Sequence, residues 1–137
     1  MRKLSTRRWG AELQADGTAN FRLWAPSIEQ LSLDLKGRGA LAMKREDDGW
    51  HEISVEEVAA GQDYGFLLPN GALVPDPASR AQARDVHSYS LLIDSAFEWQ
   101  CAEWQGRPWE EAVVYELHPG TFTEEGTFDA IQQKLDH

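Results

Sequence analysis

The chain has 137 residues, a length that suits one domain with its own hydrophobic core. Its formal net charge of −10 argues against nucleic acid as a partner, since phosphate binding needs clustered cations. The clustered cations Arg2, Lys3, Arg7 and Arg8 precede no apolar run of signal-peptide or membrane-spanning length. We therefore expect no membrane association and, with Cys101 unable to form an internal disulfide, a cytoplasmic location.

Short segments of alternating apolar and polar residues recur through the first half of the chain. Phe21 to Trp24 and Leu31 to Leu35 both alternate with period two, and Ala25-Pro26-Ser27 separates them. Similar segments, separated by turn signals such as Asp47-Asp48-Gly49, run over residues 9–13, 40–45, 50–55, 63–68 and 72–74. Strands with one apolar face need a second sheet to cover that face, so the pattern predicts an all-β sandwich.

The second half of the chain has a different character. An irregular polar stretch follows Pro75, residues 91–93 form a possible short strand, and Trp99, Trp104 and Trp109 stand in a segment without alternation. We therefore expect three parts. They are a β-sandwich domain over residues 1–93, an aromatic linker over 94–111 and a further unit over 112–137.

The last unit has the pattern of one strand followed by one helix. Ala112 to His118 is a nearly continuous apolar run, which predicts a strand buried on both faces, as in a parallel sheet or a barrel. Thr127 offers an N-cap, and Phe128, Ile131 and Leu135 share one helical stripe. Because a parallel strand needs neighbours, we expect the chain to be the front end of a larger protein.

Five motifs resemble a known family. They are Trp9-Gly10-Ala11-Glu12-Leu13, Phe21-Arg22-Leu23-Trp24-Ala25-Pro26, Val74-Pro75-Asp76-Pro77-Ala78-Ser79-Arg80, Arg107-Pro108-Trp109-Glu110-Glu111-Ala112-Val113-Val114-Tyr115-Glu116-Leu117-His118 and Gly120-Thr121-Phe122-Thr123. In this order they closely resemble the N-terminal part of the maltooligosyltrehalose trehalohydrolases, glycoside hydrolases of the α-amylase superfamily.

The resemblance implies a fold and an activity. The fold is an immunoglobulin-like sandwich, of the type grouped with starch- and glycogen-binding modules, followed by the first strand and helix of a (β/α)8 barrel. The activity is hydrolysis of the α-1,4 bond next to the terminal trehalose of maltooligosyl trehalose. The family's nucleophile and acid/base lie on later barrel strands, so the resemblance assigns no catalytic residue here.

Glu116 and His118 are two apart on the expected strand and share a face. They fit the active-site wall of an intact barrel, or a structural hydrogen-bonded pair. The histidines lack ligand spacing and one cysteine cannot build a thiolate zinc site, so we expect no metal, and no motif indicates a cofactor.

The remaining candidate function is sugar binding at a surface of the sandwich. If Phe21 faces the core, then Arg22 and Trp24 face away from it, and Trp50 and Glu52 do the same on their own strand. An exposed indole beside polar groups can stack on a pyranose while its neighbours bond the hydroxyls. The alternative is that Trp24 and Trp50 pack under loops or against a barrel.

Several functions stay open at this point. The favoured hypothesis is a non-catalytic N-terminal domain of a trehalose-releasing hydrolase, whose partner is the missing barrel of the same polypeptide. The alternatives are an α-1,4-glucan-binding module, the N-terminal domain of a related branching or debranching enzyme, or a small protein acting through protein contacts. The strand expected over residues 112–118 has no neighbour within this chain. We therefore also predict either a homodimer formed through it or poor order for residues 109–137.

Overall fold

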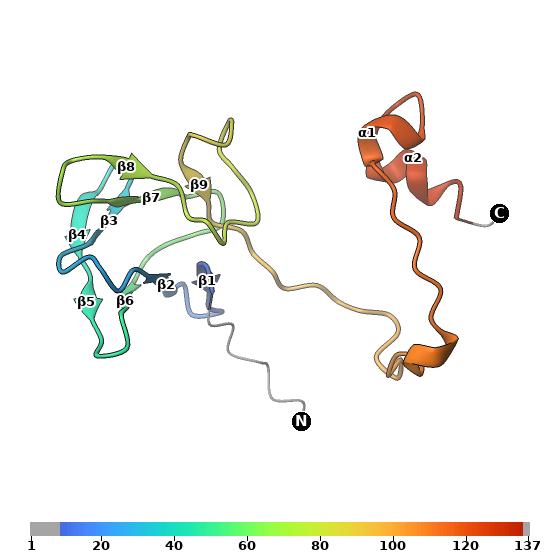
Figure 1. Ribbon diagram of the computed structural model, residues 1–137, viewed down its shortest axis with the longest axis horizontal. Helices are drawn as coiled ribbons and strands as arrows, with labels where there is room; N and C mark the ends of the chain where they lie inside the picture. Colours follow the sequence, from blue (N-terminus) through green and yellow to red (C-terminus); the bar gives the residue numbers. More distant parts are fainter. Residues whose placement is uncertain (1–8, 136–137) are drawn as a thin grey trace. The chain divides into compact units, whose positions relative to one another are not determined.

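The computed structural model describes residues 9–135 and divides into two compact units, one ending at Phe97 and one beginning at Glu98. The named strands all belong to the first unit (Figure 1). They are β1 (Glu12–Leu13), β2 (Ala19–Trp24), β3 (Ser32–Leu35), β4 (Gly39–Ala42), β5 (Lys44–Arg45), β6 (Trp50–Val55), β7 (Asp63–Leu67), β8 (Leu73–Val74) and β9 (Ser90–Leu91). Within the described residues no helix has the length and apolar character to cross a bilayer.

The strands form two antiparallel sheets, which confirms the expectation of a mostly antiparallel β structure with few helices. The first sheet has the order β1-β2-β6-β5, and the second has the order β4-β3-β7-β8. β9 also pairs with β7, beside the half of β7 that β8 leaves unpaired. The expected return strand over 40–45 is in fact two strands, because the chain passes from the second sheet into the first after β4.

The two sheets share one hydrophobic core. Phe21 of the first sheet and Leu33, Tyr64 and Phe66 of the second are almost completely buried. The rings of Phe21 and Tyr64 meet edge to face with their centroids 5.0 Å apart. This contact joins the inner faces of the two sheets, so alternate residues of β2, β3, β6 and β7 point outward.

The segment after β8 is held to this core by a buried carboxylate. Asp76 is only 2% exposed, accepts a hydrogen bond from the Tyr64 hydroxyl at 2.8 Å and donates its backbone amide to Ser90 Oγ at 2.9 Å. Arg80 donates to the carbonyl of Ala11 at 3.2 Å. The Pro-Asp-Pro-Ala-Ser-Arg motif therefore ties the second sheet to the chain just before β1.

The second unit contains a 3₁₀ turn (Trp109–Glu111) and two short helices, α1 (Pro119–Phe122) and α2 (Phe128–Gln132). Thr127 caps α2, because its hydroxyl accepts a hydrogen bond from the Ala130 amide at 3.2 Å. The expected helix is therefore present but shorter. Of its predicted apolar stripe, Ile131 is buried, whereas Phe128 and Leu135 are exposed.

The structure shows no strand over residues 112–118, where the sequence predicts one. The segment has no ladder partner within the described residues, and Val113 is 94% exposed. The apolar run is therefore an extended segment. An isolated strand has no hydrogen-bonding neighbour and no cover for its side chains, so the pattern alone cannot make it form.

Candidate functional site: the outer face of the first sheet

The four residues predicted for sugar binding lie together on the outer side of β2 and β6. Arg22 pairs with Glu52 and Trp24 pairs with Trp50 in the antiparallel register. Phe21 and His51 lie between them in sequence and are fully buried, so the intervening side chains project outward. We call this surface the β2/β6 face, formed by Asn20, Arg22, Trp24, Trp50, Glu52 and Ser54.

Cross-strand polar pairs organise one end of the β2/β6 face. Ser54 Oγ donates a 2.6 Å hydrogen bond to Asn20 Oδ1. In the next row Arg22 Nε lies 3.2 Å from Glu52 Oε1. Paired side chains on one face of a ladder restrain each other's rotamers, so these contacts orient the four polar groups.

Indole rings occupy the other end. Trp24 is 50% exposed, and its Nε1 donates to the carbonyl of Asp48 at 3.1 Å. Trp9 meets Trp50 edge to face with ring centroids 4.7 Å apart and is itself 56% exposed. These contacts orient the rings, and about half of the surface of Trp9 and of Trp24 remains exposed.

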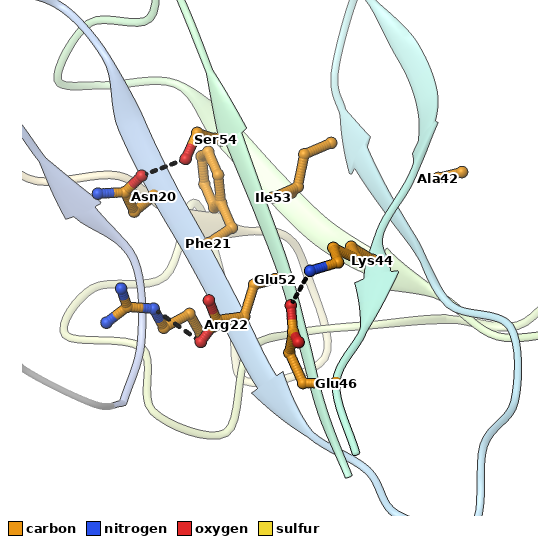
Figure 2. A pocket seen from close by; sticks show the side chains of 9 residues that line it. All are labelled: Asn20, Phe21, Arg22, Ala42, Lys44, Glu46, Glu52, Ile53 and Ser54. Atoms are coloured by element: carbon orange, nitrogen blue, oxygen red, sulfur yellow. Dashed lines mark hydrogen bonds and ion pairs between the residues drawn. The ribbon is translucent and has the colours of Figure 1, made fainter. Parts of the chain in front are cut away.

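A surface hollow of about 350 Å³ lies beside the polar pairs and next to the edge strand β5 (Figure 2). It is lined by Asn20, Phe21, Arg22, Ala42, Lys44, Glu46, Glu52, Ile53 and Ser54. Figure 2 shows three paired contacts around it, including the ion pair of Lys44 Nζ with Glu46 Oε1 at 2.7 Å. The hydrogen bond and the charge of Glu46 raise the pKa of Lys44 above the ordinary value of a lysine.

The hollow is electrically balanced. Arg22 and Lys44 supply two positive charges, and Glu46 and Glu52 supply two negative charges. A balanced set of donors and acceptors suits a neutral, hydroxyl-rich ligand better than an anion or a cation. Each carboxylate lies beside a cation, Glu52 beside Arg22 and Glu46 beside Lys44.

Glu116 and His118 lie in the second unit, and both are exposed. The carbonyl of His118 accepts hydrogen bonds from the amides of Thr121 and Phe122 at the start of α1. The imidazole lies over Gly120, where an added Cβ would come within 3.0 Å of its Cε1 atom. Their role in a barrel wall stays a prediction.

Sequence reasoning missed part of the β2/β6 face. Asn20 and Ser54 have the same strand parity as Arg22 and Glu52, so extending the alternation by one step would have found them. Lys44 and Glu46 could not be found this way, because their place depends on the passage of the chain from one sheet into the other.

Known proteins match the chain strongly, although no family model matches it. Seven of the curated relatives found bear the name malto-oligosyltrehalose trehalohydrolase. The one from Saccharolobus solfataricus is 41% identical over 129 residues, which cover 94% of this chain and 23% of that protein. A 1,4-alpha-glucan branching enzyme from Mesorhizobium japonicum is 28% identical over 128 residues, covering 80% of this chain and 17% of that enzyme.

A solved structure also matches most of this chain. A putative alpha amylase from Salmonella typhimurium superposes with a TM-score of 0.78 at 46% identity, over 93% of this chain and 22% of that one. The fold and these matches define the class, a β-rich segment shared with enzymes of the α-amylase family. Within that class the chain is a homologue of the malto-oligosyltrehalose trehalohydrolases, which confirms the resemblance of the sequence motifs. It spans only 23% and 22% of the length of the relatives from Saccharolobus solfataricus and Rhizobium sp..

Proposed function

We propose that this chain is the non-catalytic accessory part of a trehalose-releasing α-glucan hydrolase. In this proposal the two-sheet unit up to Phe97 is an immunoglobulin-like sandwich, and residues 112–135 form the first strand and helix of a (β/α)8 catalytic barrel. The observation that carries the proposal is the 41% identity to a trehalohydrolase over 94% of this chain, within 23% of that protein. The whole protein would act among the cytoplasmic enzymes of glucan and trehalose metabolism.

The exposed apolar segment supports the barrel part of the proposal. Val113, Val114 and Tyr115 are all largely exposed, although their pattern is that of a buried strand. Exposed side chains of this kind in a row are costly unless another surface covers them. Neighbouring strands of a barrel would supply both the cover and the missing ladder hydrogen bonds.

The test is an assay of the isolated chain and of the full-length polypeptide on maltooligosyl trehalose. Retaining glycoside hydrolysis needs two carboxyl groups about 5–5.5 Å apart, and the proposal places that pair in the barrel. We expect trehalose release by the full-length protein and none by the isolated chain. Transfer of glucan branches without trehalose release would support a branching enzyme and overturn the proposal. Hydrolysis by the isolated chain would also overturn it.

A second candidate function is α-glucan binding by the β2/β6 face. The observation that favours it is the alignment of two fixed indoles with two rows of polar pairs and a charge-balanced hollow. From Asn20 to Trp24 the face extends about 13 Å, four residues at roughly 3.3 Å each. A ring stacked on Trp24 could therefore continue into sugar residues that meet the polar pairs.

This function is tested by titrating the isolated chain with maltoheptaose while amide NMR shifts and tryptophan fluorescence are recorded. We expect localised shifts in β2 and β6, and affinity at least about ten-fold weaker in Trp24→Ala. Trp104→Ala is the matched control, since Trp104 is also exposed but lies in the second unit. Equal losses in both variants, or no shifts in a folded chain, would rule out the β2/β6 face as the binding surface.

A further inference from the structure

The hollow beside the β2/β6 face lies where the ladder between β5 and β6 stops. Lys44, the first residue of β5, pairs with Glu52 of β6. Two residues further along, the same ladder would place Ala42 opposite Ser54. Ala42 instead pairs with Ser32 in the second sheet, so the ladder does not reach Ser54. The hollow is the gap that results, and Ala42 and Ser54 both line it (Figure 2).

The main chain of Ser54 faces this gap. In an antiparallel strand, the amides and carbonyls of successive residues point toward opposite neighbours. On the β5 side of β6 the Glu46 amide donates to the Trp50 carbonyl, at 2.7 Å. On the β2 side the Ala25 amide donates to the Gly49 carbonyl, at 3.0 Å. Ser54 has the parity of Trp50, so its amide and carbonyl point into the gap, where neither has a hydrogen-bond partner among residues 9–135.

The free part of this edge is one residue long. Glu52, two residues before Ser54, is paired with β5. Two residues after Ser54, the carbonyl of Glu56 accepts a hydrogen bond from Arg38 Nη1 at 3.0 Å. An added peptide strand needs a longer row of alternating amides and carbonyls. The gap therefore suits a small ligand that bonds one amide and one carbonyl.

The lining of the hollow combines donors, acceptors and apolar groups. Ser54 Oγ donates to Asn20 Oδ1 and keeps its own lone pairs as acceptors. The four charged side chains lie in pairs of opposite sign, and Ala42 and Ile53 add apolar surface. A hydroxyl group both donates and accepts, so a neutral ring with several hydroxyls matches this lining better than an ion does. The volume of about 350 Å³ is near the lower end of the range of ligand sites, about 300–1,000 Å³, which indicates a small sugar.

We propose that the hollow binds one pyranose unit of a neutral sugar through the main chain of Ser54. One hydroxyl of the ring accepts a hydrogen bond from the Ser54 amide, and the neighbouring hydroxyl donates one to the Ser54 carbonyl. This inference rests on the proposed sugar-binding role of the β2/β6 face and deepens it with a site that needs neither Trp24 nor Trp50. The pyranose unit belongs either to a free disaccharide such as trehalose or to an α-glucan chain.

NMR titration of the chain with trehalose and, separately, with maltoheptaose tests the proposal. We expect a saturable shift of the Ser54 amide signal and slower hydrogen exchange of that amide when sugar is bound. Ala42→Leu fills the hollow opposite Ser54 and should weaken binding there at least about ten-fold. Ala40→Leu is the matched control, because Ala40 is also exposed on β4 but does not line the hollow. This control should bind sugar as the wild type does.

The two sugars distinguish the two sources of the ring. Shifts of the Ser54 amide with both sugars would assign the hollow to a free disaccharide, and shifts with maltoheptaose alone would assign it to a ring of a longer chain. Either result supports the site. No shift of this amide with either sugar in a folded chain, or equal losses in Ala42→Leu and Ala40→Leu, would overturn the inference.

Titration of Trp24→Ala separates the hollow from the proposed stacking of glucan on the indoles. If Trp24→Ala binds maltoheptaose as the wild type does while Ala42→Leu does not, the stacking role of Trp24 is refuted and the hollow is supported. If Ala42→Leu keeps full affinity while Trp24→Ala loses it, the hollow is refuted and the stacking role remains. Neither titration depends on trehalose release, so both are independent of the proposed reaction.

Discussion

The hydroxyl of Tyr64 donates a 2.8 Å hydrogen bond to Oδ2 of Asp76, and both side chains are buried between the second sheet and the segment that follows it. Burial raises the pKa of Asp76. Burial, followed by the charge and hydrogen bond of Asp76, raises the pKa of Tyr64. Tyr64 therefore stays a protonated donor, and the Asp76 carboxyl accepts hydrogen bonds from it and from the Ala78 amide.

Removing either partner should destabilise the first unit. Asp76→Ala is expected to lower the free energy of unfolding by about 2–3 kcal/mol, because the Tyr64 hydroxyl is left buried without an acceptor. Tyr64→Phe should cost a similar amount. Urea unfolding of the isolated chain measures both, and the double variant should lose clearly less than the sum of the two. Strict additivity within about 0.5 kcal/mol would contradict a direct coupling.

His51 is a buried histidine in β6 whose two ring nitrogens have no hydrogen-bond partner within the described residues. Burial lowers its pKa, and the positive charge of Arg45 in the neighbouring strand adds to the effect. The folded state therefore holds His51 neutral. Below pH 6.5, the pKa of histidine in the unfolded chain, His51 is protonated in the unfolded state but stays neutral in the folded state. The free energy of unfolding therefore decreases as the pH falls.

His51→Phe should remove this pH dependence. The phenyl ring fills a similar space without buried nitrogens, so the variant should equal or exceed the wild type in stability at pH 7.5. Its advantage should grow as pH decreases to about 5. Urea unfolding at several pH values gives the difference. A constant difference across this range would show that His51 protonates equally in both states.

Gly49 should tolerate no side chain. Its φ is +87°, and an added Cβ would lie 2.7 Å from Cβ of Pro26. Gly37 has a similar φ of +91° but open space around it, which makes it a matched control. We expect Gly37→Ala to cost about 1 kcal/mol and Gly49→Ala about 3 kcal/mol or more in thermal or urea unfolding. Equal costs would mean that Pro26 moves away freely.

Thr127 should control the order of α2. Thr127→Ala removes the acceptor for the Ala130 amide and should cost the helix about 1 kcal/mol, whereas Thr127→Ser retains the oxygen and most of the stability. Amide hydrogen exchange at Ala130 and Ile131 reports the change directly. Faster exchange of equal size in both variants would assign the effect to the methyl group instead of the hydroxyl.

The parts of this structure that sequence could predict depend on local signals. Thr127 was recognisable as an N-cap, and the alternation of Phe21 with Arg22 correctly assigned the buried and exposed sides of β2. The pairing of Trp50 with Trp9 was not recognisable, because it depends on tertiary contact between distant segments. The apolar run through Val113 indicates burial, but no described strand lies beside it, so the pattern could not predict its conformation here.

β8 and β9 occupy successive halves of one edge of β7, and the chain leaves that edge after Val74 and rejoins it at Ser90. The residues between them form a loop that returns to the same edge of β7, and its tip includes Val86, which is 69% exposed. Since doubling the length of a flexible loop costs only about 0.6 kcal/mol, the tip is a natural insertion point. An epitope or a fluorescent reporter spliced in there would leave every hydrogen bond of the sheet in place.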